Sequence, residues 1–241
     1  MFTFKWLGQG GFELTLGDKR VIIDPYLSDS VIKLDGFARL LPLPVKPEEL
    51  ASDLLITTHD HLDHLDPDTL CATDFERNTY AGPEDCLRHM RELGIPESRL
   101  RRLGAGDVLH VGEARLMGVP AVHTAPEAIG VVVEYRGVRL YFTGDTLYDE
   151  RLAEVGALGI DVLFVCINGR LGNMEHGEAA RLARELPCRV VVPNHYGMFA
   201  ENTIDPAVFD ADMAGSGIYV HKPEFNVTTE LYELLRRAEN G

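Results

Sequence analysis

The chain has 241 residues, of which 45% are hydrophobic, and it carries a formal net charge of −15. This apolar fraction suffices for a substantial core, and because no low-complexity tract or Gly/Ser linker divides the sequence, we expect residues 1–241 to form a single domain. The acidic balance argues against nucleic acid or an anionic membrane as the main partner, because both attract lysine and arginine.

The N-terminal quarter of the chain predicts β-structure. Apolar and aromatic runs indicate strands over Thr3–Leu7, Phe12–Leu16 and Arg20–Asp24, and the glycine-containing turns between them indicate an antiparallel meander. The Pro-rich segment Leu41–Pro47 predicts a loop, which we expect to frame a site. Asp53–Ile56 then predicts a short buried strand.

Three helices are predicted from capping and breaking residues. Asp66 and Pro67 are typical of the N-cap and first position of a short helix. Pro83–Leu93 predicts the next helix. Glu178–Leu186 is helical by composition, and Pro187 ends it because proline cannot continue a helix.

The second half of the chain is again rich in predicted strands. β-branched and aromatic runs indicate these strands, with Arg136 and Gly137 forming a tight turn between two of them. Together the two halves predict an α/β (α+β) fold in which two mixed sheets pack face to face with helices outside. The predicted strands of this half are Ala114–Val119, Gly130–Tyr135, Val138–Phe142, Asp161–Ile167 and Arg189–Val192.

A dense group of potential metal ligands follows the buried strand. His59, His61, Asp63 and His64 stand within six residues. Imidazole suits zinc, and carboxylate extends the choice to manganese or magnesium, so this mixture is typical of a hydrolytic metal centre. We expect Asp60 to point away, because alternate residues of an extended segment face opposite sides.

Three more potential ligands each follow a predicted strand. His123, Asp145 and His195 stand where a strand gives way to a loop. Side chains in that position are held rigidly and open towards a cleft, so we expect them to join the first group. The seven candidates exceed what one tetrahedral zinc ion uses, which favours two divalent ions, manganese or zinc, about 3.5–4 Å apart.

The six-residue pattern His-x-His-x-Asp-His, over His59–His64, resembles the metallo-β-lactamase superfamily. The resemblance implies a four-layer αββα sandwich with a dinuclear site at one edge of the sheets. It also implies which residues hold each metal. The first metal would be held by His59, His61 and His123, the second by Asp63, His64 and His195, and Asp145 would bridge the two.

A narrower resemblance covers nearly the whole chain and points to the L-ascorbate-6-phosphate lactonase group. It implies a cytoplasmic, often manganese-dependent hydrolase that opens a phosphorylated sugar lactone. The segments that are similar to this group are Trp6–Phe12, Asp24–Ser30, Ile167–Arg170, Gly172–Met174 and Pro193–Phe199.

A glycine-containing loop supplies candidate substrate contacts. The side chains of Asn168, Arg170 and Asn173 carry donors that suit an anionic or hydroxylated substrate, and Arg170 suits bidentate contact with phosphate. Hydrogen bonds that stabilise the loop are an equal alternative, with Asn173 capping the following helix. Asp24 either orients a ligand histidine or closes an Asp-Pro turn.

These residues predict metal-assisted hydrolysis of a lactone. Two ions lower the pKa of a shared water and polarise the electrophilic oxygen. Asp63, as ligand or nearby base, then passes a proton to the leaving oxygen and is our catalytic candidate.

Two other functions are compatible with the same candidate ligands. A phosphodiesterase, phospholipase-like or nuclease-like, would use the same ligands; the negative charge weakens the nuclease version, whereas Leu40–Val45 offers an apolar entrance for a phospholipase. A non-hydrolytic metal-binding or redox module is the second alternative.

The partner that we expect is a small molecule, phosphorylated if the lactonase resemblance extends to the substrate. We expect no nucleic-acid and no membrane partner, since no apolar run approaches the ~20 residues of a membrane-spanning helix, and a homo-oligomer is left open. The four cysteines are widely spaced and predict reduced, buried thiols in a cytoplasmic protein.

Overall fold

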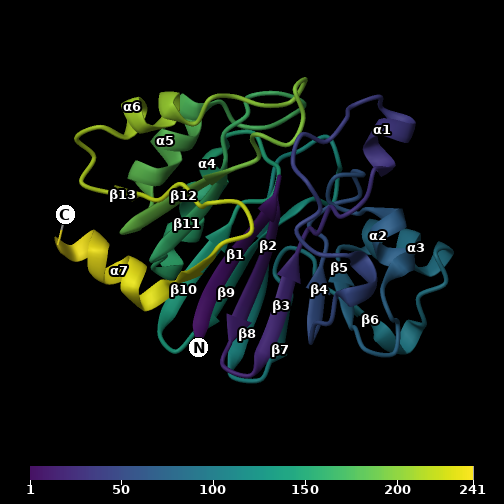
Figure 1. The fold of residues 1–241 in the computed structure, drawn as a ribbon. Helices are drawn as coiled ribbons and strands as arrows, with labels where there is room; N and C mark the ends of the chain where they lie inside the picture. Colours follow the sequence, from purple (N-terminus) through teal and green to yellow (C-terminus); the bar gives the residue numbers. More distant parts are fainter. Residues whose placement is uncertain (241) are drawn as a thin grey trace.

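Two mixed β-sheets of seven strands each face one another in the computed structural model, which describes residues 1–240 (Figure 1). The first sheet has the order β14-β1-β2-β3-β4-β5-β6. Its strands are β1 (Phe2–Gly8), β2 (Gly11–Leu16), β3 (Lys19–Ile23), β4 (Leu54–Ile56), β5 (Tyr80–Gly82), β6 (Leu100–Arg102) and β14 (Thr228–Glu230).

The second sheet has the order β13-β12-β11-β10-β9-β8-β7. Strands β7 to β10 pair antiparallel, whereas β10 to β13 pair parallel. The strands of this sheet are β7 (Val108–Val111), β8 (Ala114–Pro120), β9 (Ile129–Tyr135), β10 (Val138–Phe142), β11 (Val162–Cys166), β12 (Val190–Asn194) and β13 (Tyr219–Val220).

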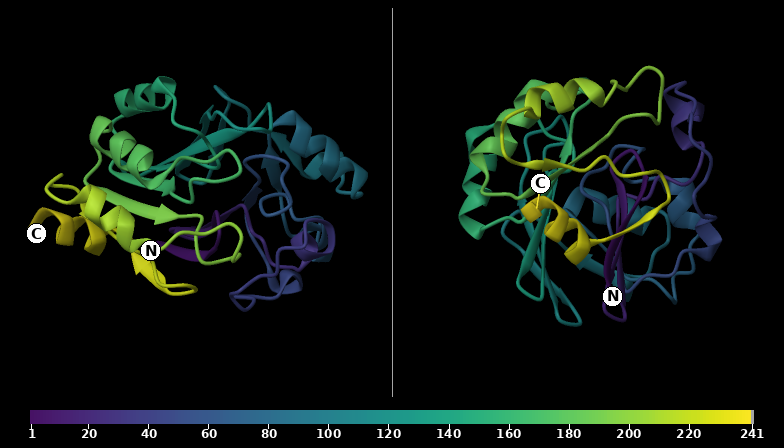
Figure 2. Two further views of the ribbon diagram at one scale, coloured as in Figure 1. Left: turned by 90° about the horizontal axis from the view of Figure 1, so that it is seen from above. Right: turned by 60° about the vertical axis from the view of Figure 1, so that its left-hand side comes forward.

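Helices flank the two facing sheets, as the right panel of Figure 2 shows. Helix α3 contacts β5 and β6, α5 contacts β11, and α7 contacts β1 and β14. This confirms the predicted α/β arrangement of two mixed sheets between helices. The helices are α1 (Ser30–Leu34), α2 (Pro67–Ala72), α3 (Glu84–Glu92), α4 (Glu150–Glu154), α5 (His176–Glu185), α6 (Ala207–Met213) and α7 (Leu231–Asn240), with 3-10 turns η1 (Pro47–Glu49), η2 (Glu97–Arg99) and η3 (Val155–Leu158).

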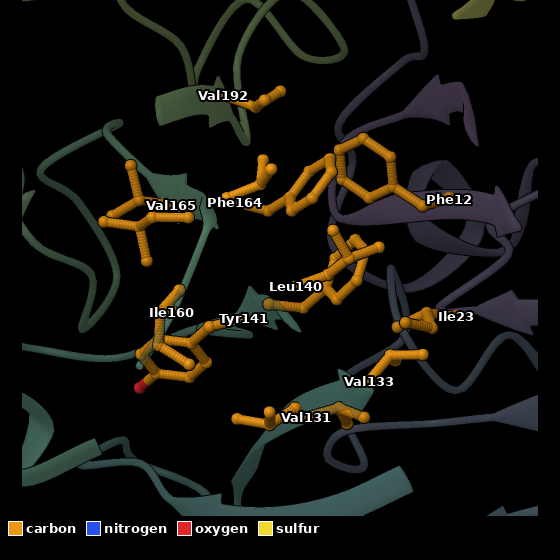
Figure 3. Packing of buried hydrophobic residues seen from close by; sticks show 14 of the residues in the cluster. Phe12, Ile23, Val131, Val133, Leu140, Tyr141, Ile160, Phe164, Val165 and Val192 are labelled. Carbon is orange, nitrogen blue, oxygen red and sulfur yellow. The ribbon is translucent and has the colours of Figure 1, made fainter. Parts of the chain in front are cut away.

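Aromatic and aliphatic side chains pack together in the core (Figure 3). Phe12 of β2 and Phe164 of β11 are both fully buried, and their ring centroids lie 5.0 Å apart in an edge-to-face contact. Phe142 of β10 stacks on Phe164 at 4.1 Å. Such contacts add to the apolar area buried, so this cluster holds the two sheets together.

Local sequence signals account for several of the elements. The meander of β1, β2 and β3 is antiparallel as predicted. Arg136 and Gly137 both have positive φ, which joins β9 and β10 by the predicted tight turn. Asp66 caps α2 by accepting a hydrogen bond from the Asp68 amide, and Pro67 stands at the first helical position.

Helix α5 begins earlier than its composition predicts. It starts at His176, and Glu175 is its N-cap. The side chain of Glu175 accepts from the backbone at Glu178 while the Glu178 side chain accepts from the Glu175 amide, a reciprocal pair that sets the start of the helix. Asn173 therefore does not cap this helix, which was one part of the alternative considered for it.

The cysteines divide between core and surface. Cys86, Cys166 and Cys188 are buried free thiols, but Cys71 is exposed, which corrects the expectation that all four are buried. Cys71 lies on α2, whose buried residues are Thr69 and Leu70, so its side chain faces away from the core. Within residues 1–240, no helix combines the length and apolar character needed to cross a membrane.

Candidate metal centre

The structure brings all seven candidate ligands to one edge of the sheets. Parallel pairing in each sheet places the carboxyl ends of neighbouring strands side by side, so the loops that follow them meet. The side chains come from the loops after β4, β8, β10 and β12. They form three overlapping groups, which are His59, His61 and His123; His59, His64 and Asp145; and Asp63, His64 and His195.

The first group is made of imidazoles. Nε2 of His123 lies 3.0 Å from Nδ1 of His61. The ring centroid of His59 lies 4.6 Å from that of His61 and 4.8 Å from that of His123, and Nε2 of His59 is buried without a hydrogen-bond partner within the described chain. Three imidazoles that converge in this way can donate lone pairs to one cation.

The group of Asp63, His64 and His195, called the second group from here on, mixes nitrogen with carboxylate oxygen. Nε2 of His64 lies 3.4 Å from Nε2 of His195 and 3.8 Å from Oδ2 of Asp63, which is itself 3.5 Å from Nε2 of His195. His64 and His195 are each 1% exposed, whereas Asp63 is partly open. This group therefore combines two fixed ligands with one that faces solvent.

Asp145 lies between the two groups. Its Oδ1 is 3.3 Å from Nε2 of His64, and its Oδ2 is 3.0 Å from Nε2 of His195 and 4.0 Å from Nε2 of His123. Oδ1 has no hydrogen-bond partner among the described residues. One carboxylate thus reaches donors of both groups.

These residues fit a divalent cation. Buried polar atoms are costly without a partner, yet Nε2 of His59 and Oδ1 of Asp145 have none within residues 1–240. Nitrogen and carboxylate ligands of this kind accept zinc, manganese or iron. A cation would satisfy the unpaired atoms and relieve the close approach of imidazole nitrogens.

The electrostatics of the cluster also suit a cation. Burial by itself would raise the pKa of Asp145, but His195 and His64 outweigh it and hold that pKa well below its ordinary value. Burial opposes protonation of His64, yet Asp145 and Asp24 hold the pKa of His64 well above its ordinary value. Burial, together with His64, lowers the pKa of His59. The cluster thus keeps ionised carboxylates and takes up protons that a metal would displace.

Asp24 holds one ligand histidine in place. Its Oδ2 lies 2.8 Å from Nδ1 of His64, so Nε2 of His64 points into the cluster. The backbone amide and hydroxyl of Thr58 donate to the same carboxylate at 2.7 and 2.6 Å. Of the two roles considered for Asp24, these contacts are those of a residue that orients a ligand.

Two glycines let backbone approach the ligand rings. The carbonyl of Gly172 lies 2.9 Å from Nδ1 of His123, which leaves Nε2 free for the cluster. A Cβ at Gly10 would lie 2.8 Å from Cε1 of His64, so a larger residue would displace that ring.

Gln9 contacts two candidate metal ligands and was not predicted from the sequence. Its Nε2 donates to Oδ2 of Asp63 at 2.8 Å and lies 3.2 Å from Nε2 of His195. The residue is fully buried with φ of +51°, which is uncommon for a residue other than glycine. The sequence signal is a single polar residue inside the glycine run Gly8–Gly11, which was interpreted as a turn and as part of a segment similar to the lactonase group, with no role given to Gln9.

A chain of amides supports Asp145 from the other side. Nδ2 of Asn173 donates to Oδ2 of Asp145 at 2.8 Å and to Oδ1 of Asn168 at 3.0 Å. Nδ2 of Asn168 in turn donates to Oδ1 of Asn202 at 2.7 Å. Asn168 and Asn173 are each 3% exposed, so their amides serve this network.

The other candidate contacts lie away from the ligands. Arg170 is exposed and its guanidinium donates to the carbonyl of Glu201 at 3.4 Å. Asp60 belongs to none of the three ligand groups and lies 3.4 Å from Nε2 of His89, in line with the expectation that it points away from them.

A cavity of about 950 Å³ opens over the ligand cluster. None of the described residues that line it is a lysine or arginine, and the segment Leu41–Pro47, which was expected to frame the site, is also absent from its lining. Residues of α1 and of the segment that follows it, between Val31 and Phe37, line the cavity instead. The lining is apolar at Val31, Leu34, Phe37, Leu62, Leu171 and Phe199, and polar at Asp35, Asp60, His61, Asp63, Thr124, Asp145 and Asn202.

Solved structures share this fold. The chain aligns with Igni18, a metallo hydrolase from Ignicoccus hospitalis, with a TM-score of 0.74 and 20% identity, over 95% of this chain and 98% of that one. It aligns with an isothiocyanate hydrolase from Delia radicum gut bacteria with a TM-score of 0.78 and 19% identity, again over 95% and 98%. The metallo-β-lactamase fold protein YhfI from Bacillus subtilis aligns as well, with a TM-score of 0.72 and 16% identity over 95% of this chain and 100% of that one, so the two sheets and flanking helices form the metallo-β-lactamase fold.

Sequence comparison identifies the family to which the chain belongs. Residues 19–196 match the Beta-lactamase superfamily domain. A UPF0173 metal-dependent hydrolase from Rubrobacter xylanophilus is 30% identical over 241 residues, which cover 90% of this chain and 93% of that protein, and one from Pyrobaculum aerophilum is 29% identical over 232 residues, covering 91% and 96%. Neither name supports the narrower lactonase resemblance. The chain belongs to the β-lactamase superfamily and, within it, to the UPF0173 metal-dependent hydrolase family.

Proposed function

We propose that this metal-dependent hydrolase binds two divalent cations, manganese or zinc, and opens a lactone. The observation that supports two ions is the pair of ligand groups with Asp145 between them. His59, His61 and His123 would hold one ion, and Asp63, His64 and His195 the other. When bound, the ions supply a water of lowered pKa and a Lewis acid for the electrophilic oxygen.

The surrounding residues orient the ligands, and one of them is assigned a proton transfer. Asp24, Gln9 and Asn173 hold a ligand histidine and two carboxylates in fixed orientations. Asp63 borders the cavity, and we assign to it the transfer of a proton to the leaving ring oxygen.

The cavity favours an uncharged substrate over a phosphorylated one. Among the described residues, its wall offers no cationic side chain, whereas Asp35 and Asp60 add negative charge to that wall. Arg170, the residue expected to bind phosphate, faces the Glu201 carbonyl instead. An unphosphorylated lactone therefore fits better than a sugar phosphate or a phosphodiester, because apart from the cations themselves the described wall offers a phosphate no positively charged partner.

The test is a substrate panel with the metal content measured alongside. Protein loaded with manganese or zinc is assayed on unphosphorylated lactones, a phosphorylated sugar lactone and bis(4-nitrophenyl) phosphate. We expect two metal ions per chain and turnover mainly of the unphosphorylated lactones. Turnover of the diester with none of the lactones would show a phosphodiesterase instead.

His61→Ala tests the assignment of the first metal. Removing one of three imidazoles should lower the metal content to about one ion per chain and cost at least about 10²-fold in activity, because the first ion loses a ligand. His110→Ala, which changes an exposed histidine on β7, is the matched control. Full metal content and activity in His61→Ala would refute the assignment.

A further inference from the structure

Leu171 adopts a backbone conformation that a leucine rarely takes. Its φ is +52°, in the left-handed region, where the Cβ of any residue other than glycine meets the backbone. Its side chain is 62% exposed, so packing does not hold it there. Gly172, beside it, has φ of +90° and no side chain to strain. A strained and exposed leucine is a feature that folding alone does not explain.

The position of Leu171 connects it to the metal centre. Its side chain lines the cavity. The carbonyl of the next residue, Gly172, contacts Nδ1 of His123 at 2.9 Å. The turn that holds a ligand histidine therefore also carries an apolar side chain to the cavity wall.

Another part of the cavity wall is also apolar, and buried aromatic rings pack behind it. Leu34, 71% exposed, and Phe37 come from α1 and the segment after it, at the upper right of Figure 1. The ring of Phe37 lies 6.3 Å from that of Phe199, which lies 5.5 Å from that of Tyr26. Phe199 and Tyr26 are each 1% exposed, so this wall is supported before any ligand enters.

Exposed apolar side chains that gather in this way mark a binding surface. A second copy of the chain seated here would close the cavity over Asp63 and Asp145. A substrate would instead touch the apolar wall and the ligand cluster at once, since the same cavity is lined by both. The volume of about 950 Å³ far exceeds an unsubstituted lactone and lies at the upper end of ligand pockets.

We propose that the substrate carries an apolar substituent that lies against Leu171, Leu34 and Phe37 while its carbonyl faces the metal cluster. The proposal rests on the proposed hydrolase function and names its substrate class, an uncharged carbonyl compound with a hydrocarbon chain. Leu171 is then a specificity residue of the loop in which the sequence argument placed Arg170.

The first experiment compares γ-lactones with alkyl chains of increasing length, on the metal-loaded enzyme. Each buried CH2 group should raise kcat/KM by about fourfold until the wall is covered. In Leu171→Gly, which removes the side chain and also relieves the backbone, the ratio of kcat/KM for the longest to the shortest lactone should fall about tenfold. Ile32→Ala, at an exposed apolar residue of α1 outside the cavity lining, should leave the ratio unchanged.

The second experiment measures binding without turnover. Metal-free protein is titrated calorimetrically with γ-dodecalactone and with γ-butyrolactone, and Leu171→Gly should weaken binding of the long lactone about tenfold. Leu171-dependent binding in this titration, combined with no hydrolysis of any lactone by the metal-loaded enzyme, would refute the proposed reaction and support the apolar site. Equal kcat/KM for all chain lengths, or a chain-length effect unchanged in Leu171→Gly, would overturn the apolar site and leave the lactonase proposal standing. Loss of a dimer in Leu171→Gly without a chain-length effect would likewise overturn it.

Discussion

Single hydrogen bonds from residues behind the ligands fix the orientation of the ligand side chains. Asp145 reaches donors of both ligand groups, and only one of its oxygens, Oδ2, accepts a hydrogen bond from the described chain outside the histidines, from Nδ2 of Asn173. Asn173 is itself held by Asn168. These amides were considered as substrate contacts, but the hydrogen bonds they make are with each other, with the Asp145 carboxylate, with Asn202 and with the Arg170 carbonyl.

Asn173→Ala should therefore weaken metal binding. The variant removes the donor that orients Asp145, and loss of such a partner costs about 10–100-fold in metal affinity. Competition with a fluorescent chelator measures the change, and Asn240→Ala, which alters an amide near the end of α7, serves as the control. Unchanged affinity in Asn173→Ala would show that Asp145 needs no such support.

At the scale of elements, the two sheets are joined mainly by aromatic packing. Phe164 of β11 contacts Phe4 and Phe12 of the first sheet, with ring centroids 5.1 and 5.0 Å away, and stacks on Phe142 of its own sheet. It is fully buried, so its removal leaves a cavity that these neighbours cannot fill.

Phe164→Ala should lower the free energy of unfolding by about 3–5 kcal/mol, the usual cost for a buried phenylalanine. The shift of the urea midpoint measures it. Leu147→Ala, at a leucine that is 45% exposed, should change stability by less than about 0.5 kcal/mol. A small effect at Phe164 would mean that the sheets repack around the missing ring.

The elements that the sequence predicted are those with a clear local signal, either an apolar run or a capping or helix-breaking residue. The meander of the first sheet and strands β8 to β12 were predicted within a few residues of their bounds. Strands β5 and β6 were missed because their three residues, Tyr-Ala-Gly and Leu-Arg-Arg, form no continuous apolar run like the Leu-Leu-Ile of β4, and they pair only through neighbours that tertiary structure supplies. Helix α1 was missed too, and with it the wall of the cavity.

At the scale of the whole molecule, metal binding and stability should be linked. The ligands come from loops of both sheets, so a cation bound by them stabilises the native arrangement of the two halves. Without a cation, buried atoms such as Nε2 of His59 lack partners within the described chain.

Adding manganese or zinc to metal-free protein should raise the melting temperature. At a hundredfold excess over the dissociation constant the gain is about 2.7 kcal/mol, or roughly 5–10 °C for a chain of this size. Thermal unfolding with and without a chelator measures it, and His61→Ala should show a smaller shift. An unchanged melting temperature in the unaltered protein would contradict metal binding at this cluster.

The sequence alone determined the fold class and the set of candidate ligands. Ligands at strand ends can be recognised because each is local, a potential ligand within three residues of the end of an apolar run, as at His59, Asp145 and His195. Gln9, Asn202 and Leu171 could not be assigned in this way, because their roles depend on which distant loop lies beside them. Arg170 and Leu171 are neighbours in the chain, but only the tertiary structure decided that the arginine faces a carbonyl while the leucine lines the cavity, since a turn with positive φ sends adjacent side chains to different surroundings.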